Sequence, residues 1–107
     1  LNSQGLYVVW VGANDFFLGL TRPATMNQVL ADTISNIANS ICKLGSFGAR
    51  HFLVGNMPDI GLSPFAKQQG PGAPQLMSHV ISQFNVALNQ TLSNLPLACA
   101  ETIDVFD

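Results

Sequence analysis

The sequence is short of charged side chains, and above all of basic ones. Charged residues make up 9% of the 107 residues, and lysine and arginine together number four. An average globular domain is about 25% charged, so much of this chain must be hidden in a core or against other protein. Because nucleic-acid binding depends mainly on basic contacts to phosphates, so few cations argue against a nucleic-acid partner.

Long apolar runs and metal-binding clusters are missing as well. No apolar run approaches the roughly 18 residues needed to cross a bilayer, and no basic-then-apolar leader is present. The two cysteines, Cys42 and Cys99, form no CxxC motif and no cluster with histidine. We therefore expect no metal centre, and nothing in the sequence calls for a cofactor. Two free buried thiols and a disulfide both fit the cysteine spacing.

The residues that are present predict alternating strands and helices. Hydrophobic residues make up 48% of the chain, and the mean hydropathy of +0.31 indicates a folded protein. Thr25 and Gln28 form a capping box ahead of the first helical pattern. Apolar runs and helical spacing predict a strand at 6–12, a helix at 26–44, a strand at 51–56, a helix at 75–93 and a strand at 102–106. This βαβαβ order predicts an α/β fold with a parallel sheet.

The predicted sheet has an uncovered face. Right-handed crossovers place both helices on one face if the sheet grows in one direction. The strand at 6–12 is apolar on both faces, so a bare face would invite aggregation, and its free edge would lack a partner. Either further chain covers that face, or the strand order reverses and this strand lies in the middle. We favour the first arrangement, in which residues 1–107 are a central fragment of a larger domain and both ends look cut.

Polar side chains follow the first two predicted strands. Asn14 and Asp15 come after the first strand, and Asn56 and Asp59 come after the second. Sites in open parallel sheets lie beyond the carboxyl ends of the strands. Judged by residue type alone, however, asparagine and aspartate after a strand are more often ordinary turn residues.

Four segments together resemble one enzyme family. The segment "VGANDFF" at 11–17 resembles the GxND segment of the GDSL, or SGNH, esterases and lipases. The segment "GARHFLVGNMPDIGLSP" at 48–64 resembles the next strand and loop of that family, and "FNVALNQTL" and "ETIDVF" resemble its following elements. The resemblance covers nearly the whole chain and is strongest to the bacterial lecithinase, hemolysin and lysophospholipase branch.

The resemblance implies a fold and a role for three residues. The fold would be part of a flavodoxin-like, three-layer α/β/α SGNH hydrolase sheet, incomplete on its own. Asn14 would donate its side-chain amide to the oxyanion of the tetrahedral intermediate, Gly12 would keep the turn tight, and Asp15 would brace the loop. One preorganised donor of this kind typically contributes about 2.7–4 kcal/mol to the transition state.

The rest of the family's catalytic residues are not in this sequence. It contains neither the GDS(L) motif of the nucleophilic serine nor the Asp-x-x-His pair, and the second oxyanion donor, a glycine, would precede Leu1. The resemblance therefore implies companion segments of the same protein that carry the serine and the aspartate and histidine.

The resemblance also suggests a substrate pocket. The long loop predicted at 56–74 is either a surface loop stiffened by proline or a wall of a lipid-ester pocket. The apolar side chains that would line the pocket are Phe16, Phe17, Met57, Ile60 and Leu62, although all of them fit a core equally well. A lipid substrate would bring contact with a membrane surface.

The cysteines take on a meaning in this fold. Cys42 closes the first predicted helix, and Cys99 precedes the third predicted strand. If the second and third strands are neighbours, both cysteines lie at the same end of the sheet, and a disulfide becomes our hypothesis. A disulfide would suit a secreted or periplasmic enzyme exported by a bacterium.

Two functions from different classes remain open from the sequence. The first is part of a serine esterase or lipase that hydrolyses lipid carboxylic esters, with lysophospholipase or acyltransferase action within its scope. The second is a non-catalytic α/β binding or assembly module that self-associates through its first strand and needs no nucleophile.

Overall fold

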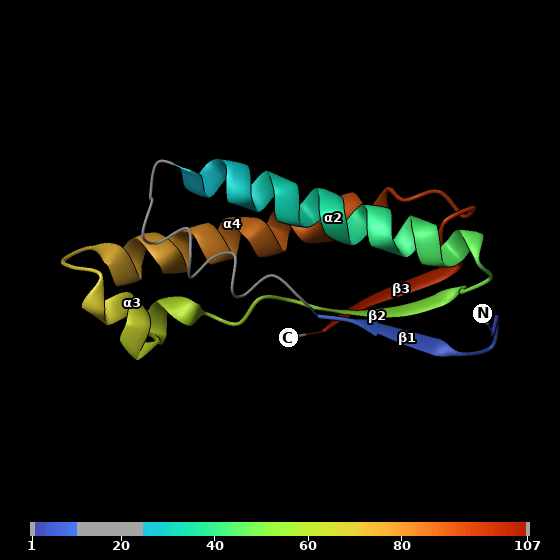
Figure 1. The fold of residues 1–107 in the computed structure, drawn as a ribbon, viewed down its shortest axis with the longest axis horizontal. Helices are drawn as coiled ribbons and strands as arrows, with labels where there is room; N and C mark the ends of the chain where they lie inside the picture. Colours follow the sequence, from blue (N-terminus) through green and yellow to red (C-terminus); the bar gives the residue numbers. More distant parts are fainter. Residues whose placement is uncertain (1, 11–24, 107) are drawn as a thin grey trace.

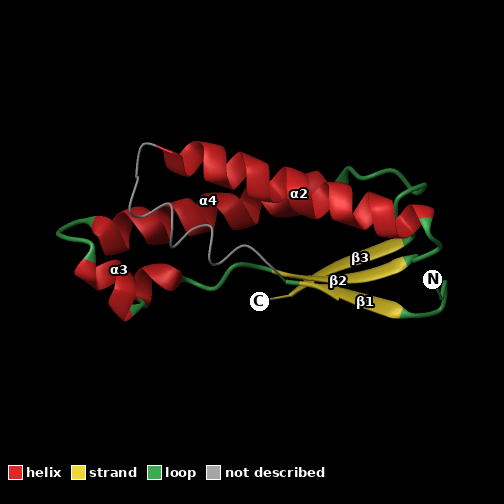
Figure 2. Ribbon diagram, viewed as in Figure 1, coloured by secondary structure: helices red, strands yellow, loops and turns green. Residues whose placement is uncertain are grey.

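The computed structural model describes residues 2–10 and 25–106, and it forms one parallel sheet with helices on one side (Figure 1). The sheet contains β1 (Leu6–Val9), β2 (His51–Gly55) and β3 (Thr102–Phe106), in the spatial order β1-β2-β3. The long helices α2 (Met26–Ser46) and α4 (Ala73–Ser93) connect the strands and lie on the same face of the sheet (Figure 2). The predicted βαβαβ order and parallel pairing are confirmed.

The strand register separates a buried sheet face from an open one. Val9 pairs with Val54, and Val54 pairs with Val105, so these side chains share the face beneath the helices. On that face Phe52 and Val54 are fully buried, because α2 and α4 cover the central strand. On the opposite face Leu6 and Val8 are each 61% exposed. Because β1 lies at an edge of this sheet, the alternative with the first strand in the middle is wrong for the described strands.

The helices form where apolar residues recur at helical spacing. Ile34, Ile37 and Ile41 give α2 a buried stripe, and Phe84 and Leu88 do the same for α4. The two stripes meet above the sheet in one continuous core. Burial of these side chains, rather than helix propensity alone, holds the helices in place. None of the helices in the described ranges is long and apolar enough to cross a bilayer.

The capping box predicted ahead of α2 is wrong. The side chain of Thr25 makes no capping hydrogen bond to the helix. Gln28, the expected reciprocal partner, instead donates its amide to Asp32 Oδ1 at 2.8 Å, one turn further along the helix. An ordinary helical i,i+4 contact has replaced the cap.

The segment predicted as one long loop at 56–74 contains two short helices. They are η2 (Ile60–Leu62), a 3₁₀ turn, and α3 (Pro64–Gln68). Asp59 accepts a hydrogen bond from the backbone of Gly61, which starts η2, and Ser63 Oγ accepts from Ala66 N, which starts α3. Local capping by polar side chains therefore turned an expected irregular loop into ordered turns.

A disulfide joins α2 to the segment before β3. It links Cys42 to Cys99, 57 residues apart in the sequence, and this hypothesis is therefore confirmed. Arg50 supports the same corner, since its guanidinium donates to the carbonyl oxygens of Gly45 at 2.8 Å and Ala98 at 3.0 Å. The corner lies at the end of the sheet opposite the carboxyl ends of the strands, so it anchors the scaffold.

Candidate functional site

The expected site lies where the carboxyl ends of the three strands meet. Ligands of open parallel sheets bind at this edge. The segment that carries Gly12, Asn14, Asp15, Phe16 and Phe17 lies outside the described residues, so the roles assigned to them stay predictions. The described part of the site consists of Trp10, the segment that follows β2, and the facing side of α4.

Trp10 fastens the carboxyl ends of the strands together. Its indole lies over Gly55, where an added Cβ would come within 2.5 Å of the ring. Its Nε1 donates to the backbone oxygen of Asn56 at 3.1 Å. Its ring also meets Phe106 of β3 edge to face, with ring centroids 5.9 Å apart. One side chain thus contacts residues of β2 and β3 as well as extending from the end of β1. It lies four residues before Asn14 in the sequence.

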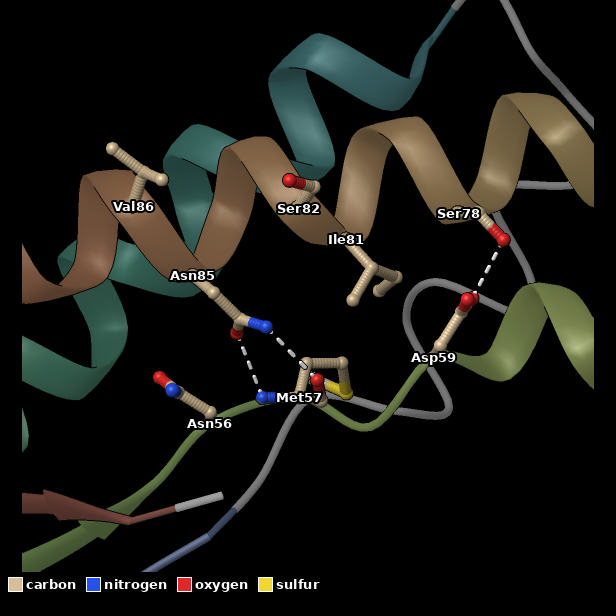
Figure 3. Close-up of a pocket in the computed structure, with 8 residues that line it drawn as sticks. All are labelled: Asn56, Met57, Asp59, Ser78, Ile81, Ser82, Asn85 and Val86. Atoms are coloured by element: carbon tan, nitrogen blue, oxygen red, sulfur yellow. Dashed lines mark hydrogen bonds between the residues drawn. The ribbon is translucent and has the colours of Figure 1, made fainter.

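A pocket opens between the chain after β2 and the side of α4 (Figure 3). Its volume is about 350 Å³, near the lower limit of common small-molecule pockets. The residues that line it are Asn56, Met57, Asp59, Ser78, Ile81, Ser82, Asn85 and Val86. Five of these eight side chains are polar, so the pocket is suited to a polar group.

Two hydrogen-bonded pairs hold the pocket walls in place (Figure 3). Asn85 Oδ1 accepts from the backbone nitrogen of Met57 at 2.9 Å, and its Nδ2 donates to the Met57 oxygen at 3.0 Å. Ser78 Oγ donates to Asp59 Oδ1 at 2.7 Å, and the same oxygen accepts from Gly61 N at 3.0 Å. Both pairs tie α4 to the segment after β2, so the pocket is built from rigid parts.

Three of the apolar residues expected to line a lipid pocket are described, and they do not gather on one wall. Met57 and Ile60 are only 4% and 8% exposed and belong to the core, although Met57 also borders the pocket. Leu62 is 70% exposed, so it lies on the surface. Of the two positions that the sequence left open for these residues, core or pocket, Met57 and Ile60 therefore lie in the core.

Sequence reasoning missed the polar residues of α4. Ser78, Ser82 and Asn85 follow one another at intervals of four and three, which puts them on one helix face. The sequence signal that could have identified them is a polar stripe next to the apolar stripe of the same helix. From the sequence alone, such a stripe looks like an ordinary solvent-facing surface, because nothing shows that the chain after β2 packs beside it.

The described residues do not contain the serine–histidine contact of a serine esterase. No serine is hydrogen-bonded to a histidine within residues 2–10 and 25–106. His51 Nδ1 lies 2.8 Å from Thr102 Oγ1 at the far end of the sheet, and His79 is exposed on α4. The chemistry available in the described part is therefore hydrogen bonding to a polar ligand.

Comparison with known proteins places this arrangement in a family. The family model of GDSL-like lipases and acylhydrolases matches residues 2–107. The chain is 33% identical over 97 residues to a phosphatidylcholine-sterol acyltransferase of Aeromonas hydrophila, covering 91% of this chain and 26% of that protein.

Further relatives come from a plant and another bacterium. Alpha-L-fucosidase 3 of Arabidopsis thaliana is 28% identical over 120 residues, covering 97% of this chain and 32% of that protein. Lipase 1 of Photorhabdus luminescens is 30% identical over 63 residues, covering 59% of this chain and 10% of that protein. The chain thus spans no more than a third of the length of these relatives. With a parallel βαβαβ sheet and a family match across 2–107, the chain belongs to the GDSL-like lipase/acylhydrolase family.

Proposed function

We propose that this chain is the part of a serine esterase or acyltransferase that supplies one oxyanion-hole donor, Asn14. Attack of the serine on an ester carbonyl puts negative charge on the former carbonyl oxygen. The amide of Asn14 donates a hydrogen bond to that oxygen without any proton transfer, which lowers the barrier. The alcohol leaves, and water or a second alcohol then takes the acyl group from the serine.

The single observation that carries the proposal is the position of the GxND segment. It follows β1 in a chain that the family model matches over residues 2–107. Trp10 holds the end of β1 against β2 and β3, through Asn56 and Phe106. A donor held just after a fixed strand end needs little movement to bind the oxyanion of the transition state. Preorganisation of this kind gives an oxyanion hole its effect.

The remaining catalytic groups belong, in this proposal, to other segments of the same protein. They are the nucleophilic serine, the second oxyanion donor and the aspartate–histidine pair. The chain spans between 10% and 32% of the three relatives described above, which leaves room for such segments. Gly12 and Asp15 support the oxyanion loop, and Phe16 and Phe17 contact the acyl chain.

We further propose that the substrate is a lipid ester and that the enzyme works outside the bacterial cytoplasm. Two relatives are named as a lipase and as a phosphatidylcholine-sterol acyltransferase, both of which act on lipids. Leu62, 70% exposed in η2 of the segment after β2, is an apolar side chain suited to a membrane surface. The disulfide between Cys42 and Cys99 supports an oxidising compartment.

The test is the replacement Asn14→Ala in the full-length protein, assayed on p-nitrophenyl butyrate. We expect kcat to fall about 10²–10³-fold with little change in KM, as for the loss of one oxyanion donor. Asn27→Ala is the matched control, because Asn27 is exposed on α2, outside the GxND segment. An Asn14→Ala enzyme with wild-type kcat would refute the role, and a wild-type protein inactive on all esters would refute the esterase function.

A further inference from the structure

The pocket in Figure 3 lies beside the strand end from which the chain leads to Asn14. Asn56, on its rim, directly follows β2, and Val54 of β2 pairs with Val9 of β1. The hydrogen bond from Trp10 to the Asn56 oxygen ties the two strand ends together. A group bound in the pocket is therefore a neighbour of the reacting ester in the proposed function.

Two groups in the pocket carry polar atoms that make no hydrogen bond to any described residue. Asp59 uses Oδ1 for Gly61 and Ser78, whereas Oδ2 makes no hydrogen bond within the described part of the chain. Ser82, one helical turn after Ser78, uses its hydroxyl in no hydrogen bond among the described residues either. Asp59 is exposed, and the two hydrogen bonds of Oδ1 restrict the direction in which Oδ2 points before any ligand arrives.

The lining excludes several kinds of ligand. An acyl chain would cover the Asp59 carboxylate and the Ser82 hydroxyl without offering hydrogen bonds, which is costly. A phosphate or carboxylate would face Asp59 with no lysine, arginine or histidine among the eight lining residues. A quaternary ammonium group would find no aromatic ring among the eight described lining residues to bind it by cation–π contact.

Neutral hydroxyl groups meet none of these objections. One hydroxyl can donate to Asp59 Oδ2 in a charge-assisted hydrogen bond, and a second can exchange a hydrogen bond with Ser82 Oγ. The cavity of about 350 Å³ suits a head group of this size better than a whole lipid. Met57 and Ile81 supply apolar surface for the carbon skeleton between the hydroxyls.

We propose that this pocket binds the alcohol part of the ester, and that the alcohol carries several neutral hydroxyl groups, as a glyceryl or sugar group does. Asp59 and Ser82 are then specificity-determining residues, and Asn85 and Ser78 position the walls. The proposal rests on the proposed esterase function and names the class of leaving group that the same site accepts.

The first experiment compares two esters with the same acyl group in the full-length protein. Glyceryl monobutyrate carries two free hydroxyls on its alcohol, and ethyl butyrate carries none. Ser82→Ala should raise KM for glyceryl monobutyrate about three- to tenfold, and Asp59→Asn about tenfold or more, as expected for hydrogen bonds to neutral and charged groups. For ethyl butyrate, whose alcohol offers no hydroxyl to either residue, KM should change much less than for glyceryl monobutyrate in both variants.

Controls separate recognition from folding. Asparagine at 59 keeps an oxygen for Gly61 N and Ser78 Oγ and puts a donating amide nitrogen in place of the second carboxylate oxygen. Because Ser82 is exposed, its replacement removes no buried contact, and both variants should retain the wild-type melting temperature. Ser35→Ala, an exposed serine of α2 outside the pocket, should leave both esters unaffected. Equal changes on both esters, or none on either, would overturn the proposal. A choline ester that alone responds to Asp59→Asn would also overturn it in favour of a cation site.

A second experiment does not depend on hydrolysis. 1-O-butylglycerol, an ether with the same head group, is titrated into the full-length protein by calorimetry. Binding that weakens at least threefold in Ser82→Ala supports the pocket even if no ester is hydrolysed, in which case only the esterase function fails. If the ether does not bind but esters are hydrolysed normally, the proposed role of the pocket is refuted and the esterase function stands.

Discussion

At the scale of single residues, the Asn85 side chain makes the pair of hydrogen bonds that a neighbouring backbone would otherwise make. Its amide contacts both the nitrogen and the oxygen of Met57, as a neighbouring strand would. Met57 is 4% exposed, so water cannot easily replace these contacts. The pair joins residues that are 28 apart in the sequence and sets the distance between α4 and the chain after β2.

We predict that Asn85→Ala destabilises the full-length protein by about 2 kcal/mol or more, because it leaves two buried backbone groups without partners. Thermal or urea unfolding measures the loss. Asn89→Ala is the matched control one turn along α4. Its amide contacts only the backbone oxygen of Asn85 on the exposed surface, so we expect a change within about 0.5 kcal/mol. Equal losses of unfolding free energy in both variants would contradict this role of the Asn85–Met57 hydrogen bonds.

Trp10 and Gly55 form a second pair that the sequence alone does not reveal. The indole occupies the space that a side chain at position 55 would fill. We predict that Gly55→Ala costs about 1–3 kcal/mol of unfolding free energy, as overpacking does, since the ring must move and leave the Asn56 oxygen.

A double-mutant cycle checks this contact. In a Trp10→Leu background the added methyl group meets a smaller side chain, so the penalty of Gly55→Ala should shrink by more than about 0.5 kcal/mol. Additive penalties, with no coupling between the two positions, would count against the contact.

At the scale of elements, the disulfide decides how firmly α2 is attached to the segment before β3. It closes a loop between positions 57 apart. In the chain-entropy picture, a loop of this length stabilises the folded state by about 4 kcal/mol. We predict that Cys42→Ala with Cys99→Ala lowers the unfolding free energy by about 2–4 kcal/mol, measured by urea unfolding without reductant.

Reduction and thiol counting provide the check on this prediction. A reductant should lower the melting temperature of the wild-type protein and leave that of the double variant unchanged. Because Arg50 contacts the same corner through several carbonyl oxygens, we expect the fold to persist after reduction. Two free thiols at Cys42 and Cys99 in denatured, unreduced protein would rule the disulfide out.

At the scale of the whole molecule, the bare sheet face is the most consequential feature. Leu6, Val8 and Trp10 are 61%, 61% and 59% exposed on it, and both long helices lie on the other side (Figure 1). An exposed apolar row of this kind along an edge strand usually marks a contact surface. We propose that the rest of the full-length protein covers it.

That proposal predicts a large effect of charge at Val8. In the full-length protein, Val8→Asp would bury an unpaired carboxylate and should cost about 3 kcal/mol or more, beyond the ~1 kcal/mol that strand propensity explains. Leu97→Asp is the control, because Leu97 is 77% exposed in the segment before β3. If both changes cost equally little, the face is open to solvent, and sedimentation would then test self-association through β1.

The sequence by itself determined the order of elements and the family. Apolar periodicity marks each strand and helix because burial acts on every second or every third to fourth residue, a local property. The GxND segment and its neighbours are likewise runs of adjacent residues, so Asn14 was identified as a candidate without a structure. The capping-box prediction failed at the same local scale, because the Gln28 amide donates to Asp32 one turn further along α2 instead.

Only the tertiary structure decided which distant residues share a pocket. Asp59 meets Ser78 across 19 residues, Met57 meets Asn85 across 28, and Trp10 meets Asn56 across 46. Each of these residues is ordinary in its own segment: an aspartate in a turn, an asparagine in a helix, and a tryptophan just after a strand. Their contacts arise because burial of the apolar stripes brings α4 and the strand ends together. The hydrophobic effect is non-directional, so the positions of the packed elements decide which polar side chains pair.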